Sequence, residues 1–142
     1  MKSRILLILI LFAVQASRGQ HIFLAVANEI QEFLPDGESS VFETGLSAPT
    51  GLAFDGNGNL FVADYGINSV LEFYQGGGSA FYASNTVSGP EGMAFQGGYL
   101  YVANHWANDV ERFNAAGQGS IFATVQAPTG IAFDSNGNLY VG

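Results

Sequence analysis

The chain has 142 residues, no cysteine and a formal net charge of −8. Three of its four basic residues lie within the first 18 positions, and all twelve acidic residues lie from Glu29 onward, so the part after residue 19 carries a formal charge of −11. A chain this acidic repels nucleic-acid phosphates and anionic lipid surfaces, which argues against nucleic-acid binding and peripheral membrane binding. The length suits one domain, which packing must stabilise because no disulfide can form.

The first residues have the pattern of a secretory signal. Two basic residues precede an apolar run over residues 5–14, which is shorter than the roughly 20 residues that a membrane-spanning helix needs. Small residues follow, and cleavage is predicted after Ala16 or after Gly19. We therefore predict a signal peptide over residues 1–19, a secreted or periplasmic location, and no membrane association once the signal is removed.

A long pattern then recurs three times, about forty residues apart. Each copy has an Asn two positions before an Ile or Val, at Asn28, Asn68 and Asn108. Downstream of it comes a Pro-x-Gly triplet that leads into an apolar residue, Ala and Phe, at Pro49, Pro90 and Pro128. A turn and a Leu-[Phe/Tyr]-Val run complete the unit. Threefold recurrence of so long a pattern indicates a repeat architecture.

Within each unit, the turn residues separate short apolar runs that have the length of strands. Residues 55–59 and 134–138 are predicted hairpin turns, because Gly and Asn tolerate positive φ. Four short strands in about forty residues are typical of a β-propeller blade. The Gly of each Pro-x-Gly triplet should open the innermost strand, where a side chain would crowd the neighbouring blade.

These residues, Pro-x-Gly-[Leu/Ile/Met]-Ala-Phe followed by Asn-Leu-[Phe/Tyr]-Val in two of the three copies, resemble the NHL-repeat β-propellers. That pattern is close to those of the senescence-marker/gluconolactonase family and the streptogramin lyases. The resemblance covers residues 22–142 and implies an all-β fold. We expect a partial β-propeller over residues 20–142, with about three four-stranded blades visible.

The repeats are too few for a closed ring of that kind. Propellers that resemble this pattern usually have six blades, which need roughly 240 residues. The first repeat lacks a recognisable innermost strand, and the last ends inside its second strand. We therefore expect a fragment of a six-bladed propeller, and the alternative is that two or more copies close one ring as an oligomer.

One rim of the propeller should carry the candidate ligand-binding residues, because each innermost strand begins where the second strand ends. The candidates there are Thr50, Asp64, Tyr65, Glu91, Asn104, His105, Trp106 and Thr129. One blade alone gathers polar and aromatic groups on this rim, with Glu91, Asn104, His105 and Trp106. We interpret the chain as a module that binds a small molecule or a protein through this rim, and we assign no catalytic residue.

Two enzyme interpretations follow from the resemblance. In gluconolactonase-like propellers a metal ligand precedes the Gly of the Pro-x-Gly triplet, a position that Glu91 occupies here, with Thr50 and Thr129 as its poorly ligating equivalents. A calcium-like divalent cation prefers six to eight oxygen ligands, so one carboxylate does not complete a site. A lyase of the streptogramin type would use a His and a Glu, for which His105 and Glu91 are the candidates.

The other charged side chains are expected to be solvated. His21, beside the predicted cleavage site, should be disordered. The acidic residues within 30–33, 70–73 and 110–113 are expected toward the outer strands and facing solvent, with Glu111 and Arg112 exposed. No calcium loop of the EF-hand type and no nucleotide-binding glycine loop is present in the sequence.

Overall fold

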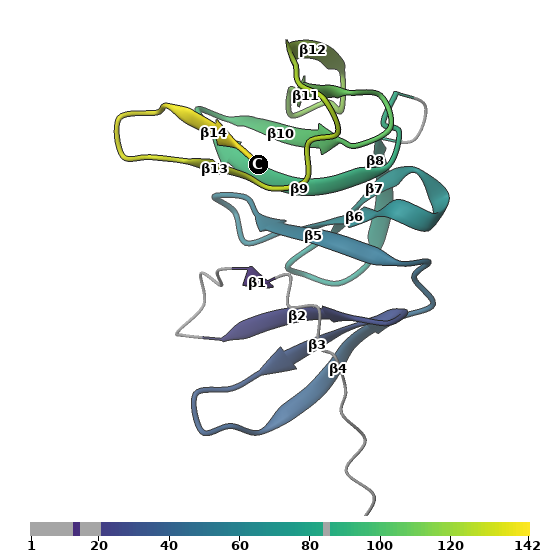
Figure 1. Cartoon of the computed structure of the whole chain (residues 1–142). Coiled ribbons are helices and arrows are strands. Elements are labelled where there is room, and N and C mark those ends of the chain that lie inside the picture. Colours follow the sequence, from purple (N-terminus) through teal and green to yellow (C-terminus); the bar gives the residue numbers. More distant parts are fainter. Residues whose placement is uncertain (1–12, 15–20, 84–85) are drawn as a thin grey trace, which may run out of the picture.

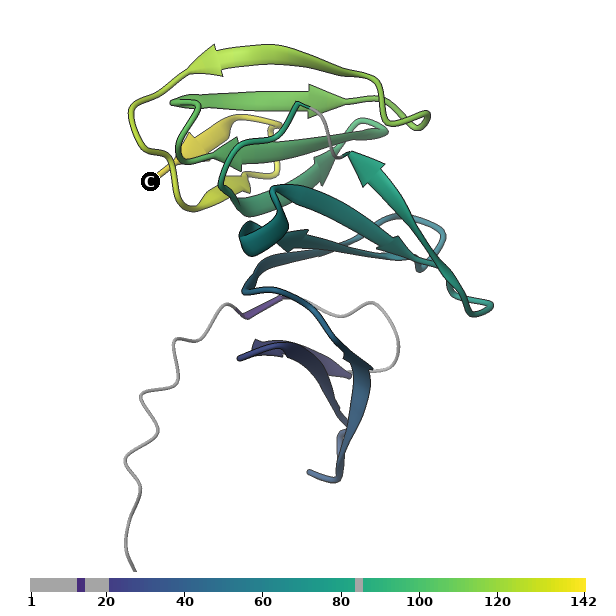
Figure 2. The ribbon, with the colours of Figure 1, turned by 90° about the vertical axis from the view of Figure 1, so that its right-hand side faces the viewer.

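The computed structural model of the chain describes residues 13–14, 21–83 and 86–142. Its strands form antiparallel sheets that follow one another along an arc, the first at the bottom of Figure 1 and the third at the top. Figure 2 shows the same succession from the side. This arrangement confirms the prediction of an all-β, partial propeller. Among the described residues, no helix is long and apolar enough to cross a membrane.

The first sheet differs from the expectation at its inner edge. Its strands, in spatial order, are β1 (Ala13–Val14), β2 (Ile22–Val26), β3 (Glu29–Phe33) and β4 (Ser39–Thr44). The two-residue strand β1 pairs with β2 in the innermost position, so the expectation that the first repeat lacks this strand is wrong. β1 belongs to the predicted signal peptide, whose other residues and cleavage positions lie outside the described residues. Cleavage there would remove β1.

The second and third sheets each follow the predicted four-strand unit. The second consists of β5 (Pro49–Phe54), β6 (Leu60–Asp64), β7 (Ser69–Phe73) and β8 (Ser79–Ala83). The third consists of β9 (Pro90–Gln96), β10 (Tyr99–Asn104), β11 (Asp109–Phe113) and β12 (Gly119–Thr124). Two further strands, β13 (Ile131–Phe133) and β14 (Leu139–Val141), pair beside the third sheet. The repeated sequence unit therefore corresponds to one blade.

Repeated polar residues fix the turns. Asp55 accepts hydrogen bonds from the backbone N–H groups of Asn57 and Asn59, both at 2.8 Å, which closes the β5–β6 hairpin. Asn68 has a left-handed backbone, with φ of 49°, and its side-chain oxygen accepts a hydrogen bond from the N–H of Gly89 at 2.7 Å. Asn108 likewise has a positive φ, of 59°, and its side-chain oxygen accepts a hydrogen bond from the N–H of Ala127 at 2.9 Å, so these two Asn residues make a turn and also hold the linker to the next blade.

Apolar side chains fill the spaces between neighbouring sheets. One core cluster lies between the first and second sheets and includes Ile30, Leu60 and Val62, and a second lies between the second and third sheets. Gly51 and Gly92 permit this close approach. A Cβ on Gly51 would overlap the carbonyl oxygen of Glu91, as expected for a glycine that opens an innermost strand.

Candidate functional site

Pairing within the sheets brings the predicted rim residues to one end of the blades. Pro49, at the start of β5, is opposite Asp64 at the end of β6, and Pro90 is opposite Asn104 in the next sheet. The residues that follow the two Pro positions and the loops that follow β6 and β10 therefore share one rim, as the sequence predicts. A single 3₁₀ turn over Tyr65–Ile67 forms the first of these loops.

Glu91 and His105 lie side by side on this rim. The Nδ1 atom of His105 is 3.4 Å from a carboxylate oxygen of Glu91. Both side chains are partly exposed, yet Nδ1 itself is buried and has no hydrogen-bond partner among the described residues. The backbone N–H of His105 donates to the carbonyl of Gly89 at 2.9 Å, which fixes its loop. An imidazole beside a carboxylate offers both a donor and acceptors of hydrogen bonds to a ligand.

An aromatic pair adjoins Glu91 and His105. The rings of Tyr65 and Trp106 pack edge to face with centroids 4.8 Å apart, so the pair spans the second and third blades. Trp106 is 54% exposed. Its ring also packs against Gly89, where a Cβ would come within 3.1 Å of the indole. The four side chains of Tyr65, Glu91, His105 and Trp106 are called the rim cluster below.

Gly89 is a residue of this site that the sequence interpretation missed. The equivalent positions of the other repeats are Ala48 and Ala127, and all three have positive φ. Only Gly89 leaves room for an indole, and only this repeat has a Trp. The concurrence of Gly89 and Trp106 in one repeat is the sequence signal that could have revealed the contact.

The two threonine candidates make contacts between neighbouring blades. The hydroxyl of Thr50 lies within hydrogen-bond distance of two carbonyl oxygens, that of Pro90 at 2.9 Å and that of Ala63 at 3.2 Å. It can donate its proton to either of them. Thr129 is exposed, and its hydroxyl donates to the carbonyl of Gly142 at 3.2 Å. Thr50 therefore lies beside the rim cluster, but its hydroxyl proton is donated to backbone carbonyls. Thr129 lies on the following blade.

Asp64 and Asn104 occupy equivalent positions and are both buried, with 1% exposure each. Asp64 accepts a hydrogen bond from the N–H of Ser47 at 2.8 Å, and its other oxygen has no partner among the described residues. Asn104 donates to Asp109 at 2.9 Å and to Glu111 at 3.4 Å. Through these hydrogen bonds the two buried side chains fix the backbone next to the rim loops.

Three expectations about charged residues are wrong. Glu111 is buried, with 6% exposure, instead of facing solvent. Burial raises the pKa of Glu111, and the hydrogen bond from Asn104 partly offsets that effect. His21 is ordered, with Nδ1 2.7 Å from Glu32, instead of being disordered. Arg112 is half-buried, with its guanidinium above the rings of Tyr99 and Phe122.

The rim cluster does not fit a calcium-like cation on its own. Glu91 supplies its only carboxylate, and its nearest charged partner is an imidazole. Among the described residues, no group of three His, Cys, Asp or Glu side chains is placed to hold a metal ion. A calcium-like cation requires six to eight oxygen ligands, so the rim cluster alone does not complete a metal site.

Comparison with known proteins supports the fold. No known family model and no curated protein matches the sequence. Among solved structures, virginiamycin B lyase from Staphylococcus aureus is similar with a TM-score of 0.77 at 18% identity, over 91% of this chain and 47% of that one. The gluconolactonase XC5397 from Xanthomonas campestris is similar with a TM-score of 0.74 at 21% identity, over 89% of this chain and 52% of that one.

A third similar structure is a calcium-binding protein, regucalcin, from Agrobacterium tumefaciens. It gives a TM-score of 0.70 at 14% identity, over 84% of this chain and 47% of that one. The chain thus spans about half the length of each of the three. At these identities the likeness shows the fold alone, and the chain is an all-β protein with part of a β-propeller. The neighbours include the streptogramin lyase and gluconolactonase propellers that the repeat pattern resembles.

Proposed function

We propose that the chain is an exported binding module that holds its ligand at the rim cluster. The observation that carries the proposal is the exposed indole of Trp106, held on Tyr65 beside the Glu91–His105 pair. Exposed aromatic rings supply apolar contact area at little entropic cost, and an adjacent carboxylate and imidazole supply hydrogen bonds. The ligand is a small molecule or protein segment with a ring-sized apolar group and a polar group. Export rests on the predicted signal over residues 1–19.

Trp106 is the only tryptophan of the chain, so its fluorescence reports directly on the rim. We expect saturable emission changes when the protein is titrated with simple aromatic compounds such as phenol, benzoate and benzylamine. His105→Ala and Glu91→Gln should weaken the tightest of these about fivefold or more, the range for one lost charged or cation–π contact. Glu38→Gln, in an exposed turn, is the control. Emission that responds to none of the compounds would contradict the proposal.

The 3.4 Å separation of Glu91 and His105 favours an enzyme as the second candidate function. A hydrolase of the gluconolactonase type, with Glu91 as one ligand of a divalent cation, would need further oxygen ligands. Hydrolysis of gluconolactone that is lost on addition of a chelator and in Glu91→Gln would support it. A metal-independent lyase would instead lose activity in His105→Ala and be unaffected by the chelator.

A further inference from the structure

Each pair of neighbouring sheets shares three aromatic rings that pack edge to face. The ring centroids within each trio are 4.8–5.3 Å apart along its two packed contacts. The trios are Phe23, Phe42 and Phe54; Phe61, Tyr82 and Phe95; and Tyr101, Phe122 and Phe133. The central ring of each belongs to the second strand of a blade. The fold therefore repeats one aromatic environment at three places.

A charged residue lies directly across the sheet from each central ring. These residues are Glu32, Glu72 and Arg112, which pair in register with Phe23, Phe61 and Tyr101. Because paired residues of an antiparallel sheet project from the same face, each charge lies beside its aromatic trio. The three positions thus allow a comparison of different charges in one environment.

Two of the three positions contain a basic group or have a basic partner. Glu32 is 2.7 Å from the imidazole of His21. The guanidinium of Arg112 lies 4.7 Å from the ring centroid of Tyr99 and 5.9 Å from that of Phe122, the equivalent of Tyr82. The third sheet shows that this environment accommodates a cation above an aromatic ring.

Glu72 differs from both. It accepts a hydrogen bond from the amide of Asn59 at 3.2 Å, and that amide also donates to Asp55 at 3.0 Å. Neither ion pair found among the described residues includes Glu72. Burial, and next the negative charge of Asp55, raise the pKa of Glu72. The position therefore has an excess of negative charge beside three aromatic rings.

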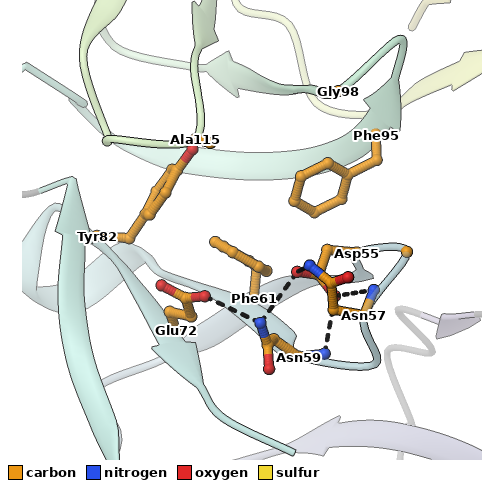
Figure 3. Close-up of a pocket in the computed structure, with 10 residues that line it drawn as sticks. Asp55, Asn57, Asn59, Phe61, Glu72, Tyr82, Phe95, Gly98 and Ala115 are labelled. Carbon is orange, nitrogen blue, oxygen red and sulfur yellow. Dashed lines mark hydrogen bonds between the residues drawn. The ribbon is translucent and has the colours of Figure 1, made fainter.

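A cavity of about 340 Å³ opens at this position. Glu72, Asn59 and Asp55 lie on one side of it, with Tyr82 and Phe95 opposite and Phe61 between them (Figure 3). The hydroxyl of Tyr82 donates to the carbonyl of Asn114, which holds the ring in place. Asp55 already accepts the hydrogen bonds of its turn, which leaves Glu72 as the main charged group available to a ligand.

We propose that this cavity binds a small organic ammonium ion, with its charge on the Glu72 carboxylate and its alkyl groups against Tyr82 and Phe95. Aromatic faces and a carboxylate together favour alkylated ammonium groups. They do not supply the several oxygen ligands that a metal ion needs. The cavity lies at the opposite end of β5 and β6 from the rim cluster, so the proposal is independent of the rim function.

Tetramethylammonium chloride is the probe for this site, titrated into the full chain and followed by NMR of the aromatic side chains. We expect saturable shifts at Phe61, Tyr82 and Phe95. Sodium chloride at equal ionic strength should give none, and tert-butanol, a neutral molecule of similar shape, should bind at least about fivefold more weakly. Equal binding of tert-butanol, no saturable shift, or shifts confined to other residues would overturn the proposal.

Substitutions at equivalent repeat positions give the matched test. Glu72→Gln should weaken tetramethylammonium binding about fivefold or more, whereas Glu32→Gln should leave it unchanged. Glu72→Arg should abolish binding, because it places a guanidinium at the position that Arg112 occupies in the next blade. Equal effects of Glu72→Gln and Glu32→Gln would show general electrostatic attraction and overturn the site. The localisation of the shifts in the unaltered chain does not depend on any variant folding.

Discussion

Asp64 and Asn104 show how one position of the repeat can carry different chemistry in successive blades. Both side chains are buried at the end of the second strand and both accept a hydrogen bond from the linker that leads into their own blade, at 2.8 Å from Ser47 and 3.4 Å from Ser88. Asn104 also uses its amide as a donor. Asp64 instead leaves one buried oxygen without a partner among the described residues.

Asp64→Asn should therefore stabilise the fold. The amide oxygen can still accept from Ser47, and removal of a buried charge should raise the free energy of unfolding by about 1 kcal/mol. Asp64→Ala removes the acceptor of the Ser47 N–H and should lower the free energy of unfolding by about 1–3 kcal/mol. Urea unfolding at neutral pH measures both. Any loss of stability in Asp64→Asn would contradict this account.

Glu111 predicts a pH dependence of stability. Because burial raises its pKa above the ordinary value of 4.5, the native state holds this proton more tightly than the unfolded chain. The contribution of Glu111 is therefore fully present below pH 4.5 and is lost as pH rises through the pKa of the folded state. Glu111→Gln should flatten this part of the stability profile and raise the urea midpoint at pH 7.

Urea midpoints between pH 4 and pH 7 measure this effect. Glu38→Gln, which alters an exposed glutamate in a turn, controls for the loss of one negative charge. If Glu111→Gln follows the same profile as the unaltered chain, the carboxyl of Glu111 is not perturbed in the native state.

At the scale of the element, the inner strands depend on their glycines because neighbouring blades approach closest there. A Cβ at Gly51 would overlap the backbone carbonyl of Glu91, which cannot move without shifting β9. Gly51→Ala should lower the free energy of unfolding by about 2 kcal/mol and disturb the Glu91–His105 pair. Gly56 has open space around it, so Gly56→Ala should change stability by less than about 0.5 kcal/mol. Thermal or urea unfolding of the two variants would test this, and equal stabilities would contradict it.

The turns and strands were predictable because their signals are local. The Asp-x-Asn-Gly-Asn sequence closes a hairpin through hydrogen bonds between residues two and four positions apart, as at Asp55. The strand β1 had no such signal. Its two residues are apolar like the rest of the run around them, and only pairing with β2 distinguishes them.

At the scale of the molecule, the arc leaves large apolar side chains exposed on its last two sheets. Ile121, Phe122 and Tyr140, on the third sheet and the pair beside it, are all exposed. Uncovered faces and strand edges favour association with another copy. A recombinant chain of these 142 residues should therefore self-associate. Light scattering should give a mass that rises with concentration above 15.0 kDa, and a monomer at all concentrations would contradict this.

The sequence by itself determined the all-β class, the repeat and the end of the blades where the rim candidates lie. These features depend on local turn residues and on a periodic pattern that needs no knowledge of distant contacts. It also predicted that Glu91, His105 and Trp106 share a rim, because strand alternation fixes which loops meet.

Only the tertiary structure decided what these side chains contact. It turned Asp64, Asn104 and Glu111 inward, packed Trp106 on Tyr65 across two blades, and left Glu72 beside three aromatic rings without a cationic partner among the described residues. Those outcomes depend on how neighbouring blades face each other. A repeat pattern cannot specify this, because equivalent positions such as Glu32, Glu72 and Arg112 carry different charges in the same environment.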